Sequence, residues 1–404
     1  MRPAELLELI QQSTGVLKLD SVVRGFRRRT RQFPVDLSDI LQALGESQTI
    51  QEVHCCPVFT FGLAENEWNQ IIRALGKMPC LQTLKFLDYG HGGFLTLPAA
   101  GLSTVLRNAK QLESLELSDK VVIVDTERMD ECEQLADALA ESSLGHLVCE
   151  CLFRGGQAAR RIIVTRGIQR CSTLETLTLR DHLRQLTTEQ TVAVVEALPS
   201  LKHLSLYTNQ WSAIGRTLST NHTLHKLALT DHFVEPQQFC TFLENLTPND
   251  TLRELSICLI EGFSHYTMKE GLNRFIRQNK HLHSLCLKDS LSGRPSTSWA
   301  TSFQWTDWSY LASSERLNGR IQINIDGMSQ HVPPSASDAA RYWRYRTLVE
   351  VENALNRTHN LLELVHEISA KDDLFRVECL FCFFVRHPGV FRQASTPRIS
   401  KSIV

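Results

Sequence analysis

One six-residue pattern, L-x-x-L-x-L with other apolar residues at some Leu positions, recurs nine times in this 404-residue chain. The copies begin at Ile50, Leu81, Leu112, Leu144, Leu174, Leu201, Leu224, Leu252 and Leu282. Successive copies start 23 to 32 residues apart. A unit of that length cannot bury its apolar face alone, so such a period indicates stacked repeats that share one core.

The local patterns predict the structure of one repeat. Apolar and polar residues alternate within each copy, as in Leu177-x-Leu179, which is the period of a β-strand. Most copies follow a segment with helical spacing, such as TVLRNAKQ at 104–111 and TVAVVEALPS at 191–200. A helix between successive strands makes a crossover connection, which favours parallel strands. We therefore expect a curved α/β solenoid with parallel strands on its concave face and helices on its convex face.

These repeats resemble the leucine-rich repeat family, and their helix-bearing units are similar to the ribonuclease-inhibitor type of NOD-like receptors and the Ran GTPase activator. The resemblance covers residues 36 to 290 and adds Ile321-x-Ile323-x-Ile325 as a last strand. The family's Asn after the third Leu stands in place only as Asn209. Five copies carry Asp one position earlier, where we expect turn caps that accept backbone N–H bonds: Asp88, Asp119, Asp181, Asp231 and Asp289.

The flanking segments suggest four regions. We expect a leading or capping segment at 1–35, the solenoid at 36–330, a helical C-terminal element at 331–390 and a mobile polar tail at 391–404. The segment 290–310 interrupts the solenoid and holds Trp299, Trp305 and Trp308, which either cover the last repeat or form an exposed binding anchor. The 331–390 element is either a cap or an effector module.

The predicted binding surface consists of residues that alternate with the buried leucines and therefore point onto the concave face. Its members are Lys85, Glu116, Glu150, Thr178, Arg180, His203, Ser205, Tyr207, Lys226, Glu254 and Lys288. Both charge signs occur, which suits a protein partner, because paired charges select the partner and its register. A nucleic-acid reader would be expected to show a basic stripe with several aromatic residues, and only Tyr207 is aromatic here. The alternative is a merely solvated face.

The overall charge and the termini predict the compartment. Lys and Arg total 43 and Asp and Glu total 44, so the chain has no net attraction for nucleic acid or an anionic membrane. The sequence shows neither a secretion signal nor a run long enough to span a membrane. We expect a cytoplasmic protein whose 12 cysteines are reduced. Five arginines between Arg24 and Arg31 are either a nuclear-import or phosphate-binding patch or a solvated cap of the first repeat.

Common catalytic and metal-binding motifs are missing from the sequence. It contains no G-x-S-x-G, no H-E-x-x-H and no finger-spaced quartet of Cys and His. Cys379-x-x-Cys382 lies in an apolar segment, and the glycines of DYGHGGF at 88–94 lack the Lys of a phosphate-binding loop. The Asp-His pairs at 181–182 and 231–232 occupy one repeated slot, which favours a scaffold role over a metal site. We therefore predict no enzyme activity, cofactor, metal or small-molecule substrate.

The sequence favours a non-enzymatic scaffold that binds a protein partner on its concave face. The resemblance also leaves two regulatory alternatives, a GTPase activator and a substrate adaptor of a degradation complex. In the first alternative, the arginines near residues 24–31 would stabilise phosphoryl charge.

Overall fold

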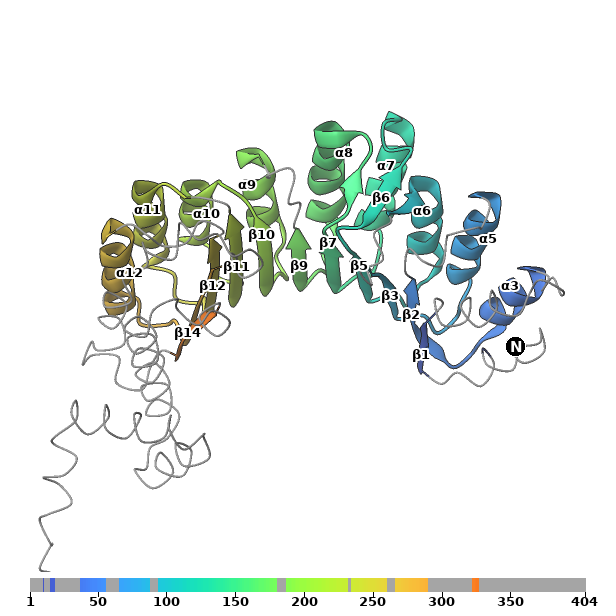
Figure 1. The fold of residues 1–404 in the computed structure, drawn as a ribbon, viewed down its shortest axis with the longest axis horizontal. Coiled ribbons are helices and arrows are strands. Elements are labelled where there is room, and N and C mark those ends of the chain that lie inside the picture. Colours follow the sequence, from blue (N-terminus) through green and yellow to red (C-terminus); the bar gives the residue numbers. More distant parts are fainter. Residues whose placement is uncertain are drawn as a thin grey trace, which may run out of the picture. The chain divides into compact units, whose positions relative to one another are not determined.

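The computed structural model describes residue 10 and residues 15–18, 37–55, 65–87, 94–179, 187–231, 234–259, 266–289 and 322–326. The chain divides into two compact units, Met1–Thr230 and Asp231–Val404. Each unit is built from alternating strands and helices (Figure 1).

The repeat strands of the first unit form one parallel sheet in which each lies next to the strand of the following repeat. They are β2 (Ile50–Cys55), β3 (Thr83–Phe86), β5 (Ser114–Leu117), β7 (His146–Cys149), β9 (Thr176–Leu179), β10 (His203–Tyr207) and β11 (Lys226–Asp231). A further strand that the repeat pattern did not predict, β1 (Gly15–Lys18), pairs with β2. The predicted repeat strands and their parallel order are confirmed.

Helices cover one face of this sheet (Figure 1). They are α3 (Leu37–Glu46), α5 (Glu65–Leu75), α6 (Ala99–Asn108), α7 (Met129–Ala140), α8 (Gly156–Ile162), α9 (Thr188–Ala197) and α10 (Trp211–Leu218). The chain continues from α8 through a π-helical turn at Ile163–Gly167. The start of α9 follows from its sequence, because the Thr187 hydroxyl accepts the Gln190 N–H while the Gln190 side chain accepts the Thr187 N–H. The segments at 104–111 and 191–200, whose spacing predicted helices, overlap α6 and α9, which end at Asn108 and Ala197.

The core of the first unit lies between sheet and helices. Leu177, Leu204 and Leu227 occupy matching positions of β9, β10 and β11, and each is at most 2% exposed. Complete burial of one such side chain contributes about 1.5–3 kcal/mol relative to leaving it in water. The apolar side chains of these repeat strands therefore pack in the core. The side chains on the opposite side of the sheet remain available for other contacts.

Three repeats of the first unit contain a second short strand between the repeat strand and the helix. These strands, β4 (Leu95–Pro98), β6 (Val121–Val124) and β8 (Leu152–Phe153), form a separate parallel sheet in that order. The repeat pattern did not predict them, because they lie outside the recurring six-residue pattern and are only two to four residues long. The apolar run Val121–Val124 was the available signal.

The second unit repeats the same alternation. It contains α11 (Pro236–Leu246), β12 (Glu254–Leu259), α12 (Tyr266–Gln278), β13 (Ser284–Asp289) and β14 (Gln322–Asp326). Its strands β12, β13 and β14 are parallel neighbours, which confirms the last strand expected at 321–325. Parallel strands that alternate with helices in both units confirm the α/β leucine-rich repeat fold.

Three asparagines close the turns that precede repeat strands. Asn221, Asn249 and Asn279 each lie three residues before the first Leu of a copy. The Oδ1 atom of each accepts two backbone N–H groups, for example those of Thr251 and Leu252 at 3.1 and 2.7 Å from Asn249. Asn249 and Asn279 are 2% and 1% exposed. The sequence prediction missed these residues, although their constant distance from the repeat Leu was visible.

None of the nine cysteines among the described residues forms a disulfide, and six of them are buried. The Sγ atoms of Cys149 and Cys151 lie 3.6 Å apart without a bond between them. Asp231, expected in a turn, is instead the last residue of β11 and is 1% exposed. It lies on the core side of the strand with Leu227 and Leu229, because β11 continues beyond the six-residue pattern.

Candidate functional site

The strand face of the first unit is the side of its sheet opposite the helices. Two rows of side chains cross it, because parallel register places one residue of each strand beside its neighbour. The first row is Glu52, Thr83, Ser114, His146, Thr176, His203 and Lys226. The second row is His54, Lys85, Glu116, Val148, Thr178, Ser205 and Ala228.

Six residues of the predicted binding surface lie on this strand face. Lys85, Glu116, Thr178 and Ser205 are half-buried, whereas His203 and Lys226 are exposed. Glu150 is half-buried and directly follows β7. In the second unit, Glu254 is exposed at the start of β12. Lys288 belongs to β13, but its side chain lies outside the described residues, as does all of Arg180.

Tyr207 requires a correction. Strand alternation predicts it on the strand face after His203 and Ser205, yet its side chain is 1% exposed. Alternation predicts the side of the sheet on which a side chain lies, but not its exposed fraction. Tyr207 is the last residue of β10, so the accessible part of the strand face ends before it.

A linked group of charges lies at the β2–β3 end of the strand face. Glu52 Oε1 accepts from Lys85 Nζ at 2.8 Å and from His54 Nε2 at 2.6 Å. The hydrogen bond from Lys85, followed by that from His54, lowers the pKa of Glu52 below its usual 4.5. Because Glu52 is ionised at neutral pH and bonded to two neighbours, the group presents a fixed arrangement of charge.

Two further histidines continue the first row. His146 is half-buried, and its pKa is lowered mainly by desolvation, which the nearby charge of Glu116 opposes. His203 is exposed, and its Nδ1 lies 3.5 Å from Thr176 Oγ1. The predicted binding surface did not include Glu52, His54 and His146. Their places in the rows follow from the same alternation that identified Lys85 and Glu116.

The strand face holds polar and charged groups of both signs. Within the described ranges, no group of three or more His, Cys, Asp or Glu side chains is arranged to hold a metal ion. None of the helices that the structure describes is long and apolar enough to cross a membrane.

Several sequence motifs lie outside the described residues. They are the arginines at 24–31, the glycines at 90–93, the Asp181-His182 pair and His232, the tryptophans of 290–310, the Cys379-x-x-Cys382 pair, and the segments 331–390 and 391–404. Their predicted roles stay predictions.

Comparison with known proteins gives a distant structural match. No protein-family model and no curated protein matches the sequence. A solved structure described as the TLR13-ssRNA13 complex is similar, with 15% sequence identity and a TM-score of 0.30. The match covers 63% of this chain but only 38% of that chain. The fold assignment therefore rests on the strand order and the repeat pattern of this chain.

Proposed function

We propose that this protein is a non-enzymatic recognition scaffold that binds a protein partner on the strand face of its first unit. The observation that supports this proposal is the alternation of buried and accessible side chains along each strand. Inward residues such as Leu177 and Leu204 are at most 2% exposed, whereas their outward neighbours Thr178 and Ser205 keep part of their surface accessible. Helices occupy the other face of the sheet (Figure 1), so the strand face is where these repeats offer variable side chains.

The chemistry of the strand face suits a polar protein surface with both charge signs. The Glu52–His54–Lys85 group at one end is already bonded internally, so little side-chain entropy is lost when a partner covers it. Small hydroxyl residues, including Thr83, Ser114, Thr176 and Thr178, occupy the middle of the two rows. Small side chains allow close approach of a partner and can donate or accept hydrogen bonds.

Site-specific photo-cross-linking tests this proposal in the native cell. A photoreactive phenylalanine analogue at Thr178 places the probe on the strand face through β9. The matched control carries the probe at Glu196, an exposed residue of α9 in the same repeat region. We expect a discrete protein adduct from position 178 that position 196 does not give. Adducts of equal identity and yield from both positions would contradict the proposal.

A further inference from the structure

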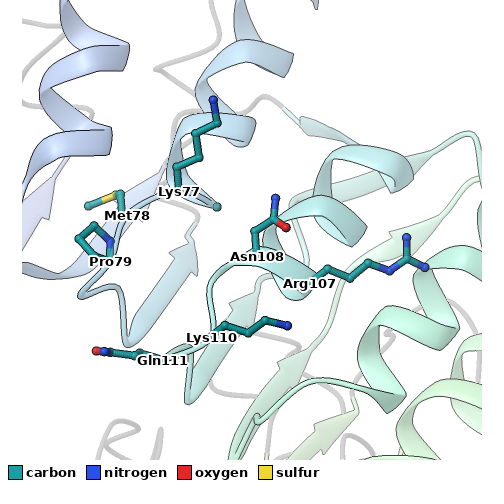
Figure 2. A pocket seen from close by; sticks show the side chains of 8 residues that line it. Lys77, Met78, Pro79, Arg107, Asn108, Lys110 and Gln111 are labelled. Carbon is teal, nitrogen blue, oxygen red and sulfur yellow. The ribbon is translucent and has the colours of Figure 1, made fainter.

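A hollow lies between two helix-to-strand turns of the first unit, away from the two rows of the strand face. It has a volume of about 440 Å³. Its lining comes from the turn between α5 and β3, from the end of α6 and from the turn between α6 and β5, and it includes Gly76, Lys77, Arg107, Asn108, Lys110 and Gln111 (Figure 2).

The lining is cationic and contains no acidic side chain. Lys77, Arg107 and Lys110 are all exposed. Among the residues the structure describes, neither Lys77 nor Lys110 has an ion-pair partner, and Arg107 donates from Nη2 to the Gln134 carbonyl at 3.3 Å. That bond fixes one guanidinium while leaving its positive charge uncompensated. Three positively charged residues therefore line one open space.

The turn after α5 approaches the backbone of α6 closely. A Cβ atom added at Gly76 would lie 3.2 Å from Val105 Cα and 3.5 Å from the Thr104 carbonyl oxygen. A side chain at position 76 would therefore require the end of α5 and α6 to move slightly apart, which glycine avoids. The close packing brings Lys77 near the end of α6, which carries Arg107 and is followed by Lys110, although about thirty residues separate them in sequence.

The helix ends decide which anion fits best. The hollow lies at the C-terminal ends of α5 and α6, where the helix dipoles place partial negative charge. A compact dianion such as phosphate would be repelled as it approached that backbone. Separate carboxylates can instead be met at the tips of the long Lys and Arg side chains, several ångströms from the carbonyls.

We propose that this hollow is a docking site for an acidic, extended peptide segment of a protein partner, with Lys77, Arg107 and Lys110 each facing a carboxylate. The site is independent of the strand face. It adds a second contact to the scaffold, and two contacts on one chain would raise the avidity for a partner that carries both epitopes.

Fluorescence anisotropy with a labelled twelve-residue peptide of alternating Glu and Ser tests the site on the full chain. We expect saturable binding at about 150 mM salt, weakened by higher salt because exposed charges are screened. The double variant Arg107→Glu/Lys110→Glu should weaken binding about tenfold, since two favourable pairs become repulsive. A peptide with Gln in place of Glu should not bind.

The second unit supplies a matched control. Arg277 and Lys280 are exposed residues at the same distances from their repeat Leu as Arg107 and Lys110, so Arg277→Glu/Lys280→Glu changes the net charge equally. It should leave peptide affinity within about twofold. An unchanged thermal midpoint and circular dichroism spectrum would show that each variant is folded.

Four results would overturn the site. They are no saturable binding of the Glu peptide, equal losses in the two double variants, tighter binding of a phosphoserine peptide of equal charge, and loss of binding in Thr178→Arg. Loss of binding in Thr178→Arg would indicate that the peptide binds on the strand face instead of in the hollow. Because Thr178→Arg lies on the strand face, failure of the hollow and failure of the proposed function are distinguishable.

Discussion

The turns before the repeat strands are closed in two different ways in different parts of the chain. In the copies that begin at Leu112, Leu174 and Leu201, the N–H of that Leu donates to the backbone carbonyl three residues earlier, at 3.1 to 3.3 Å. In the copies that begin at Leu224, Leu252 and Leu282, the same N–H donates to an Asn side chain at 2.7 to 2.9 Å. One sequence position therefore holds a buried polar group in some repeats and an apolar or thiol side chain in others.

The difference shows which turns depend on a particular residue type. An Asn turn also links repeats, since Asn279 Nδ2 donates to the carbonyls of Thr247 and Asn249 at 3.3 Å. Such a turn depends on one residue type that satisfies several buried groups. A backbone-closed turn makes no such demand. The first unit's backbone-closed turn before Leu112 also carries the exposed Lys110 of the cationic hollow.

The largest expected effect is that of Asn279→Ala. The change leaves two N–H groups and two carbonyls without their partner in a buried turn, so we expect a loss of about 3 kcal/mol in unfolding free energy. Urea denaturation followed by circular dichroism measures it, with the exposed neighbour Gln278→Ala as control. A loss below about 1 kcal/mol would mean that the turn does not depend on its Asn.

A smaller but substantial effect is expected from installing Asn in a backbone-closed turn. Leu198 occupies the matching position before Leu201 and is 2% exposed. Leu198→Asn should destabilise the protein by about 2 kcal/mol, because a buried apolar side chain is lost and a polar amide is buried in its place. Unchanged stability in the same urea experiment would show that the two kinds of turn are interchangeable.

Cys171→Asn should change stability less, by about 1 kcal/mol or under. Cys171 lies three residues before Leu174, and its Sγ already faces the Leu144 carbonyl at 3.7 Å, as an Asn amide could. Cys171→Leu is the informative comparison, since it fills the site without a donor. If Asn proved as damaging here as at position 198, polarity and not local geometry would decide what the turn accepts.

The smallest effect is a pH dependence that comes from the strand face. The folded-state pKa of His146 is below its usual 6.5, so the unfolded chain takes up this proton first as the pH falls. The contribution of His146 to stability is therefore complete above pH 6.5 and declines as the pH falls through 6.5 toward the folded-state pKa. His146→Gln should flatten thermal midpoints measured across this range, and an unaltered slope would contradict the burial argument.

Sequence periodicity predicted the repeat strands, the last strand β14 and the sides of the sheet, because alternation and spacing are local properties. It did not predict the burial of Tyr207, because alternation gives the side of the sheet and not the exposed fraction of a side chain. It also missed the cationic hollow, because Lys77, Arg107 and Lys110 meet only through the packing of α5 on α6. The turn asparagines were readable in principle, since each stands three residues before a repeat Leu.

The central claim is that the strand face of the first unit binds a protein. Its most direct test is the affinity of the protein captured at position 178 for two variants of the full chain, measured by titration calorimetry. We predict that Thr178→Arg weakens binding at least about tenfold, because a long charged side chain blocks close approach in the middle of the face. Glu196→Arg on α9 should bind like the native chain. Equal affinities of Thr178→Arg and the native chain would contradict the account.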